Sequence, residues 1–121
     1  MLGTMDAARA IADLTEISPQ VKDVVIADKA DEILGTNALP ERASQLLAGA
    51  RSMLRHADDL RPQPIAQLEA ATTAGSVFVV RDGEQVIAAT TSPEPTVGLV
   101  FYDLKSCLRS LAEPSSRDAA A

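Results

Sequence analysis

Two segments of the chain are apolar on both of their alternating faces, and this pattern constrains the fold most strongly. One is Val24-Val25-Ile26, inside a predicted strand of residues 21–28, and the other is the predicted strand of residues 76–81. Successive side chains of a strand point to opposite faces of its sheet, so both faces of these strands need cover. We therefore expect a sheet that lies between two layers of helix.

Two segments in the first half of the chain have apolar residues at helical spacing, as expected for helices that bury one face. The first has Thr4 or Asp6 as its candidate N-cap and ends at Ser18-Pro19. The second, which is the longest, runs from Pro40 to about Leu60, and the prolines within residues 61–64 stop it. The predicted apolar positions are Ala7, Ala10, Ile11, Leu14 and Ile17 in the first, and Ala43, Leu46, Leu47, Ala50, Met53, Leu54 and Ala57 in the second.

A last helix follows Pro93 and Pro95 and is predicted to end before Pro114. Its apolar stripe consists of Val97, Val100, Leu104, Cys107, Leu108 and Leu111. Leu99 and Tyr102 lie off this stripe. We predict that both pack on the first helix, which should lie beside the last one.

Three further strands, of residues 31–36, 65–73 and 85–91, complete the predicted sheet. Residues 28–31 form a tight turn, and Asp82-Gly83 is a strong hairpin signal. The predicted order is α-β-β-α-β-β-β-α. The sequence thus predicts an α/β fold, a three-layer α/β/α sandwich with a five-stranded, mostly antiparallel sheet. It occupies one domain of residues 1–113, and residues 114–121 are expected to form a disordered tail.

The charge of the chain argues against several classes of partner. Its 121 residues carry a formal net charge of −6. Nucleic-acid phosphates and anionic membrane surfaces both attract clustered lysine and arginine, not acidic proteins. No apolar run approaches the ~20 residues of a membrane span, and the N-terminus lacks the pattern of a signal peptide. We expect a cytoplasmic protein that binds neither nucleic acid nor membrane.

The residues that carry most catalytic chemistry do not form a recognisable group. His56 is the single histidine, and only Asp59 lies one turn from it as a further ligand. A metal site needs three or four convergent ligands. A glycine-rich phosphate loop is absent, so the chain is not itself a GTPase. Cys107 lies on an apolar helix face, as a small buried hydrophobic residue does. We expect no enzymatic activity, no metal and no cofactor.

Two features indicate that the chain pairs with a second copy. The strand of residues 65–73 is expected at the sheet edge and contains no proline or lysine to discourage pairing. Gly49 lies inside the longest helix, where glycine costs about 1 kcal/mol relative to alanine, and a close helix–helix contact would explain it. The alternatives are an ordinary protected edge and a tolerated glycine. The predicted dimer interface consists of Gln45, Gly49, Ser52, Met53, His56, Leu60, Gln67, Leu68, Glu69, Ala70 and Ala71.

The order of elements, with Gly98-Leu99-Val100 and Tyr102-Asp103-Leu104 in the last helix, resembles the Roadblock family of dynein light-chain-like domains. Residues 17–21, 28–31 and 46–57 fit the same pattern. The resemblance implies a Roadblock/profilin-like fold and a homodimer or heterodimer, in which the longest helices pair and the third strands join into one sheet. It also implies a platform for a Ras-like small GTPase, or an adaptor in motor and signalling assemblies. Phe101 stands where bacterial members commonly have a basic residue, and residues 61–64 replace a glycine-rich link.

The outer face of the longest helix is the candidate partner-binding surface, and it consists of Ser44, Ala48, Arg51, Arg55 and Asp59. Arg51 and Arg55 lie one turn apart and are expected to contact acidic groups of the GTPase; the alternative is a solvated helix face. We predict a dimeric interaction module that binds and regulates a Ras-like GTPase in a bacterial signalling system. The other hypotheses are a non-regulatory scaffold and a sensor that holds a small ligand between the sheet and the helices.

Overall fold

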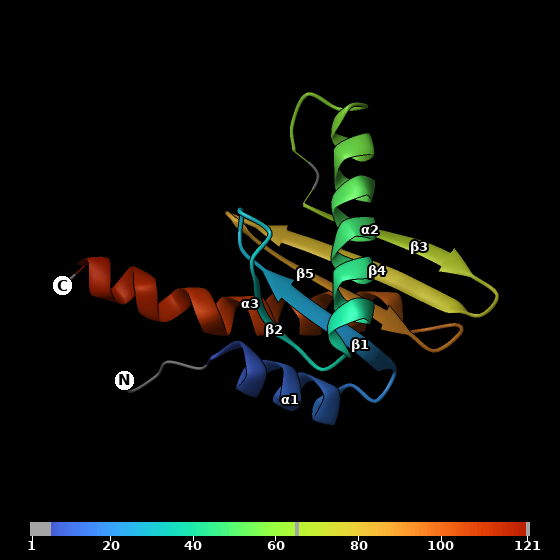
Figure 1. The fold of residues 1–121 in the computed structure, drawn as a ribbon, viewed down its shortest axis with the longest axis horizontal. Helices are drawn as coiled ribbons and strands as arrows, with labels where there is room; N and C mark the ends of the chain where they lie inside the picture. The colour runs from blue at the N-terminus through green and yellow to red at the C-terminus, as the bar shows by residue number, and fades with distance from the viewer. Residues whose placement is uncertain (1–5, 65, 121) are drawn as a thin grey trace.

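A computed structural model describes residues 6–64 and 66–120 of the chain. Its elements follow the predicted order (Figure 1). They are α1 (Ala7–Ile17), β1 (Val21–Ala27), β2 (Ile33–Thr36), α2 (Pro40–Asp58), β3 (Gln67–Thr72), β4 (Gly75–Asp82), β5 (Gln85–Thr91) and α3 (Val97–Ala120). The strands and the first two helices begin and end within a few residues of their predicted bounds, although Ile65, the expected start of the third strand, lies outside the described residues.

The described strands form one five-stranded sheet in the order β2-β1-β5-β4-β3, and each neighbouring pair is antiparallel. This order leaves β2 and β3 at the two edges. Helix α2 crosses one face of the sheet, whereas α1 and α3 cover the opposite face (Figure 1). The structure therefore confirms the predicted α/β/α sandwich.

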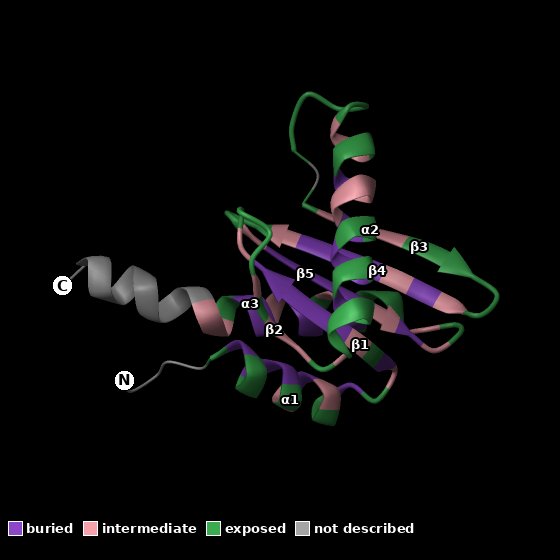
Figure 2. Cartoon of the chain, viewed as in Figure 1, coloured by how far each residue is buried: buried purple, intermediate pink, exposed green. Residues whose placement is uncertain are grey.

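The two apolar faces of the central strands build two separate hydrophobic clusters. Val24 and Ile26 of β1 lie in the cluster under α1 and α3, and Val25 between them lies in the cluster under α2. Phe78 and Val79 of β4 divide in the same way. Figure 2 shows the resulting buried sheet centre beneath the exposed outer face of α2. The α2 residues buried against the sheet are Ala43, Leu46, Leu47, Ala50 and Leu54.

Phe101 has a packing role in the α1 and α3 layer. Its ring lies edge-on to that of Phe78, with ring centroids 4.9 Å apart and an interplanar angle of 71°. This is a favourable arrangement for two aromatic rings. A basic residue at this position would lose that contact, so Phe101 stabilises the packing of this layer.

Side chains and glycines fix the ends of several elements. The Asp6 carboxylate caps α1 by accepting a hydrogen bond from the Arg9 amide at 2.8 Å; the other predicted cap, Thr4, lies outside the described residues. Gly83 has a φ of +62° in the predicted β4–β5 hairpin. At Gly35, a Cβ atom would lie 2.6 Å from the Cβ of Ala7, so only glycine lets β2 pass this close to α1.

The prediction that α3 ends before Pro114 was wrong, because the helix continues to Ala120. A proline inside a helix removes one backbone hydrogen bond. The alanines that follow it have the highest helix propensity, which favours continuation. The division of the chain into a domain of residues 1–113 and a tail stays a prediction.

The prediction that Leu99 and Tyr102 pack on α1 was also wrong. Helices α1 and α3 do lie side by side, but Leu99 is 49% exposed and Tyr102 is 63% exposed. At 100° per residue, Tyr102 points about 160° away from Leu104, which faces the sheet. The helix surface that meets α1 instead contains Cys107, which is buried as predicted.

Candidate functional site

The outer edge of β3 pairs with no strand in the described part of the chain. Arg81 N donates a hydrogen bond to Ala66 O at 2.7 Å, so this opposed pair is hydrogen-bonded. Hydrogen-bonded and non-hydrogen-bonded pairs alternate along an antiparallel ladder. The register continues with Leu68 opposite Val79. It follows that the backbone groups of residues 67, 69 and 71 point away from β4 and are available to another strand.

The side chains of β3 differ between its two faces. Leu68 packs against the apolar cluster under α2, which places it on the α2 face. Glu69 lies on the opposite face, where its carboxylate accepts a hydrogen bond from the Ser76 hydroxyl at 3.0 Å. This hydrogen bond satisfies one oxygen of the Glu69 carboxylate and leaves the outward backbone groups of β3 accessible. Ala70 and Ala71 are small and exposed, so they put little side-chain bulk in the way of a partner strand.

The predicted dimer flank of α2 faces the β3 side of the sheet. Gln45, Gly49 and Met53 line a shallow groove of about 200 Å³ together with Val77 of β4. A Cβ atom built at Gly49 would have no described atom within 4 Å, so the chain itself gives no reason for a glycine there. The structure thus brings the α2 flank and the β3 edge to the same side of the molecule, as a paired interface requires.

The remaining predicted interface residues lie near the end of α2. Ser52 is half-buried and His56 is exposed, and the imidazole Nδ1 lies 2.7 Å from the carbonyl oxygen of Ser52, to which it donates. Leu60 lies beyond the helix and is exposed.

Four of the five residues predicted to bind a partner are exposed or partly exposed on α2 or at its end: Ser44, Ala48, Arg55 and Asp59. Arg51 differs, because its side chain is only 22% exposed and binds both the Asp31 carboxylate and the backbone oxygen of Asp28. Arg51 therefore fixes α2 to the β1–β2 turn. Arg55, in contrast, has no hydrogen bond or ion pair with any described residue.

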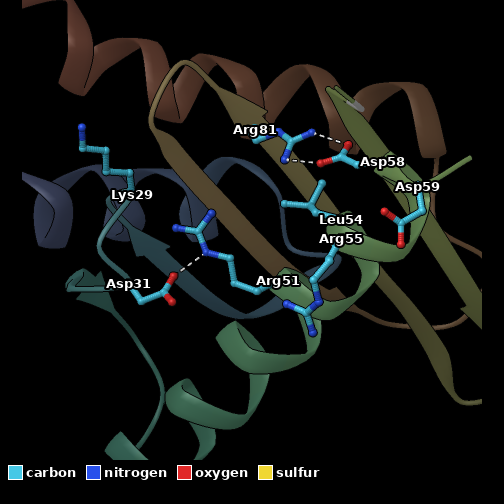
Figure 3. A pocket seen from close by; sticks show the side chains of 8 residues that line it. All are labelled: Lys29, Asp31, Arg51, Leu54, Arg55, Asp58, Asp59 and Arg81. Carbon is cyan, nitrogen blue, oxygen red and sulfur yellow. Dashed lines mark hydrogen bonds and ion pairs between the residues drawn. The ribbon is translucent and has the colours of Figure 1, made fainter. Parts of the chain in front are cut away.

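A polar cavity of about 480 Å³ opens between the β1–β2 turn, the end of α2 and β4 (Figure 3). Two ion pairs cross it. Arg51 binds Asp31, and Arg81 of β4 binds the Asp58 carboxylate through two nitrogens at 3.0 and 2.7 Å. Sequence reasoning missed the second pair, because 23 residues separate its members and no local spacing marks it. These paired charges hold the elements together and are poorly placed to do acid–base chemistry.

In the described part of the chain, no three histidine, cysteine, aspartate or glutamate side chains converge as metal ligands. Each helix described here is too short or too polar to cross a bilayer.

Solved structures provide the comparison that decides the fold. A Roadblock/LC7 domain from Streptomyces avermitilis superposes with a TM-score of 0.78 at 14% identity, over 93% of this chain and 98% of that one. The chain has the Roadblock/LC7 fold. Two MglB structures share this fold. The gliding protein MglB from Thermus thermophilus superposes with a TM-score of 0.70 at 11% identity, over 93% of this chain and 90% of that one. MglB in a tetrameric arrangement superposes with a TM-score of 0.69 at 12% identity, over 88% of this chain and 85% of that one. No protein-family model and no curated protein matches the sequence.

Proposed function

We propose that this chain is a dimeric interaction module that binds and regulates a Ras-like small GTPase and has no catalytic activity or cofactor of its own. The observation that carries the proposal is the outer edge of β3, which no strand of the described residues covers, beside the Gly49 flank of α2. Two copies related by a two-fold axis would satisfy each other's outward backbone groups and bring their α2 helices together. The Roadblock fold and its occurrence in a tetrameric MglB arrangement support self-association.

In such a dimer, the exposed face of α2 would form a platform for the GTPase. Its residues in this proposal are Ser44, Ala48, Arg55 and Asp59, with Arg51 in a positioning role. Arg55 supports the proposal best, because its charge is not used within the described chain. A cation held on a rigid helix suits an acidic surface of a partner, where it would raise the association rate and the specificity.

The experiment measures binding of a Ras-like GTPase encoded in the same genome, loaded with GDP or with a GTP analogue, to the full chain. Arg55→Glu is expected to weaken binding at least about tenfold, since it turns an attraction into a repulsion. Arg61→Glu is the matched control, because Arg61 is exposed beyond the end of α2 and undergoes the same charge change. Equal weakening by both variants, or by neither, would remove the α2 platform from the proposal.

The same assay separates regulation from mere scaffolding. A regulator binds one nucleotide state more tightly or changes the rate of GTP hydrolysis. A scaffold binds both states alike and leaves hydrolysis unchanged. We expect a preference for the GTP-bound form, and an equal affinity for the two forms would favour the scaffold.

A further inference from the structure

A groove lies on the side of α2 that meets the β1–β2 turn, and we call it the α2–turn groove. It consists of two adjoining hollows, the polar cavity of about 480 Å³ described above and a second of about 400 Å³. Asp31, Arg51 and Arg55 line both hollows and so mark the place where they meet. At 100° per residue, Arg51 and Gly49 point about 160° apart on α2. No residue that lines the groove belongs to the proposed dimer interface, so the proposed dimer leaves the groove to another partner.

The β1–β2 turn holds Arg51 in place without using its whole guanidinium group. Asp31 has a φ of +66°, a left-handed conformation that is uncommon for a residue other than glycine. Arg51 Nε donates to the Asp31 carboxylate, and Nη2 donates to the carbonyl oxygen of Asp28. The third nitrogen, Nη1, has no hydrogen-bond partner among the described residues. Arg51 therefore presents the N–H groups of Nη1 to the groove from a fixed position.

Arg55 lies one turn further along α2 and adds a second guanidinium group. In Figure 3 its side chain extends away from the Arg81–Asp58 pair. Two arginines and one aspartate line the hollow of about 400 Å³, and that aspartate already binds Arg51. Asp59 lines only the other hollow and forms no ion pair with Arg55. The surplus charge where the hollows meet is therefore the positive charge of Arg55.

The hollow of about 400 Å³ places an apolar surface beside these donors. Ile33 of β2 and Leu47 of α2 line it, and both also pack in the hydrophobic cluster under α2. Ala48 lines it from the exposed face of α2, where a small side chain leaves the hollow accessible. The groove thus joins N–H donors from two arginines to an apolar surface. An anionic group with an apolar neighbour is complementary to both parts.

We propose that the α2–turn groove binds a short acidic segment of the partner GTPase. One aspartate or glutamate carboxylate of that segment accepts hydrogen bonds from Arg55 and from Nη1 of Arg51, since its two oxygens match donors of this kind. A neighbouring apolar side chain of the segment lies on Ile33 and Leu47 and is removed from water there. This contact rests on the proposed function, because it names the part of the GTPase that meets α2.

The test uses nuclear magnetic resonance on the full chain and three short peptides with blocked ends. The first has a glutamate next to a leucine between glycine and serine residues. The second has glutamine in place of the glutamate, and the third has serine in place of the leucine. We expect the first peptide to shift the amide signals of residues 31–33 and 47–55 in a saturable way. The second is expected to bind about tenfold more weakly and the third about threefold more weakly.

Variants assign the preference for glutamate to Arg55. Arg55→Gln keeps a long polar side chain and should reduce the preference for glutamate over glutamine from about tenfold to below about threefold. Arg109→Gln makes the same charge change at an exposed position of α3 and should preserve the preference. The comparison of the peptides on the unaltered chain needs no variant to fold. Absence of a saturable shift, equal binding of the glutamate and glutamine peptides, or an undiminished preference in Arg55→Gln would overturn the proposal.

Competition separates the groove contact from the proposed function. An excess of the glutamate peptide should displace a Ras-like GTPase bound to the full chain, and the glutamine peptide should not. A GTPase that binds but is not displaced would overturn the groove contact and leave the proposed function standing. Saturable binding of the glutamate peptide, together with a failure of every such GTPase to bind, would instead overturn the proposed function and the GTPase as the source of the segment.

Discussion

Arg81 and Asp58 join β4 to the end of α2 through two parallel hydrogen bonds, from Nη1 at 3.0 Å and Nη2 at 2.7 Å. The side chains are only 20% and 34% exposed. Because β4 is the neighbour of the edge strand β3, this pair sets how α2 lies relative to that edge. The proposed dimer needs α2 and β3 in a fixed relative position, so the Arg81–Asp58 ion pair supports the interface.

Loss of this pair should destabilise the fold. Arg81→Gln leaves a half-buried carboxylate without its bidentate partner, and we expect the free energy of unfolding to fall by about 1–2 kcal/mol. Urea unfolding at fixed protein concentration measures it. Glu84→Gln is the control, because the Glu84 pair with Lys29 is on the surface and should contribute below about 0.5 kcal/mol. Equal effects of the two substitutions would refute the supporting role.

Proline at residue 71 should separate dimerisation from folding. The amide of Ala71 points away from β4 in the derived ladder, so Ala71→Pro removes a hydrogen bond only from the second copy. We expect a folded monomer by circular dichroism and sedimentation. Ala70→Pro removes an amide that faces β4 and should instead destabilise the chain itself. A dimer that persists in Ala71→Pro would place the interface elsewhere.

Gly49→Ala should have opposite effects on the monomer and on the dimer. A Cβ atom there meets no described atom of the chain, so alanine should stabilise the isolated fold by about 1 kcal/mol through helix propensity. The same Cβ atom would intrude between two closely packed α2 helices and weaken dimerisation. Urea unfolding of Gly49→Ala combined with Ala71→Pro measures the stability of the monomer. Sedimentation of Gly49→Ala alone measures the strength of dimerisation. Stronger dimerisation of Gly49→Ala would contradict the assigned helix contact.

The pH dependence of stability should reveal the buried thiol. Burial, with a smaller contribution from the charge of Asp13, raises the pKa of Cys107 from 9.0 to about 12. Between these values, the unfolded chain has lost the thiol proton while the native chain keeps it, so stability falls as pH rises. The stability advantage of the natural chain over Cys107→Ala should therefore shrink when urea unfolding is repeated above pH 9.0. A constant difference would show that the thiol is not buried.

The architecture could be predicted because it follows from local patterns. Val24-Val25-Ile26 and the strand around Phe78 required cover on both faces, and two helix layers supply it. The edge position of residues 67–72 followed from their place after a long helix and before two hairpin-linked strands. Each of these inferences uses only neighbours in the chain.

The parts that escaped prediction depend on contacts between distant segments. Arg51 appeared to lie on an open helix face, but the β1–β2 turn folds back to meet it through Asp31. Leu99 and Tyr102 were assigned to α1, but the packing of α3 leaves them exposed. The low exposure of Asp103 on α3 also has no signature in the sequence, because burial depends on the packed fold.

The proposed dimer is tested by the molar mass of the unaltered chain in sedimentation equilibrium across micromolar concentrations. We expect a reversible species of twice the 12.7 kDa chain mass, which Ala71→Pro converts to the single-chain mass. A mass of 12.7 kDa at every concentration would contradict it.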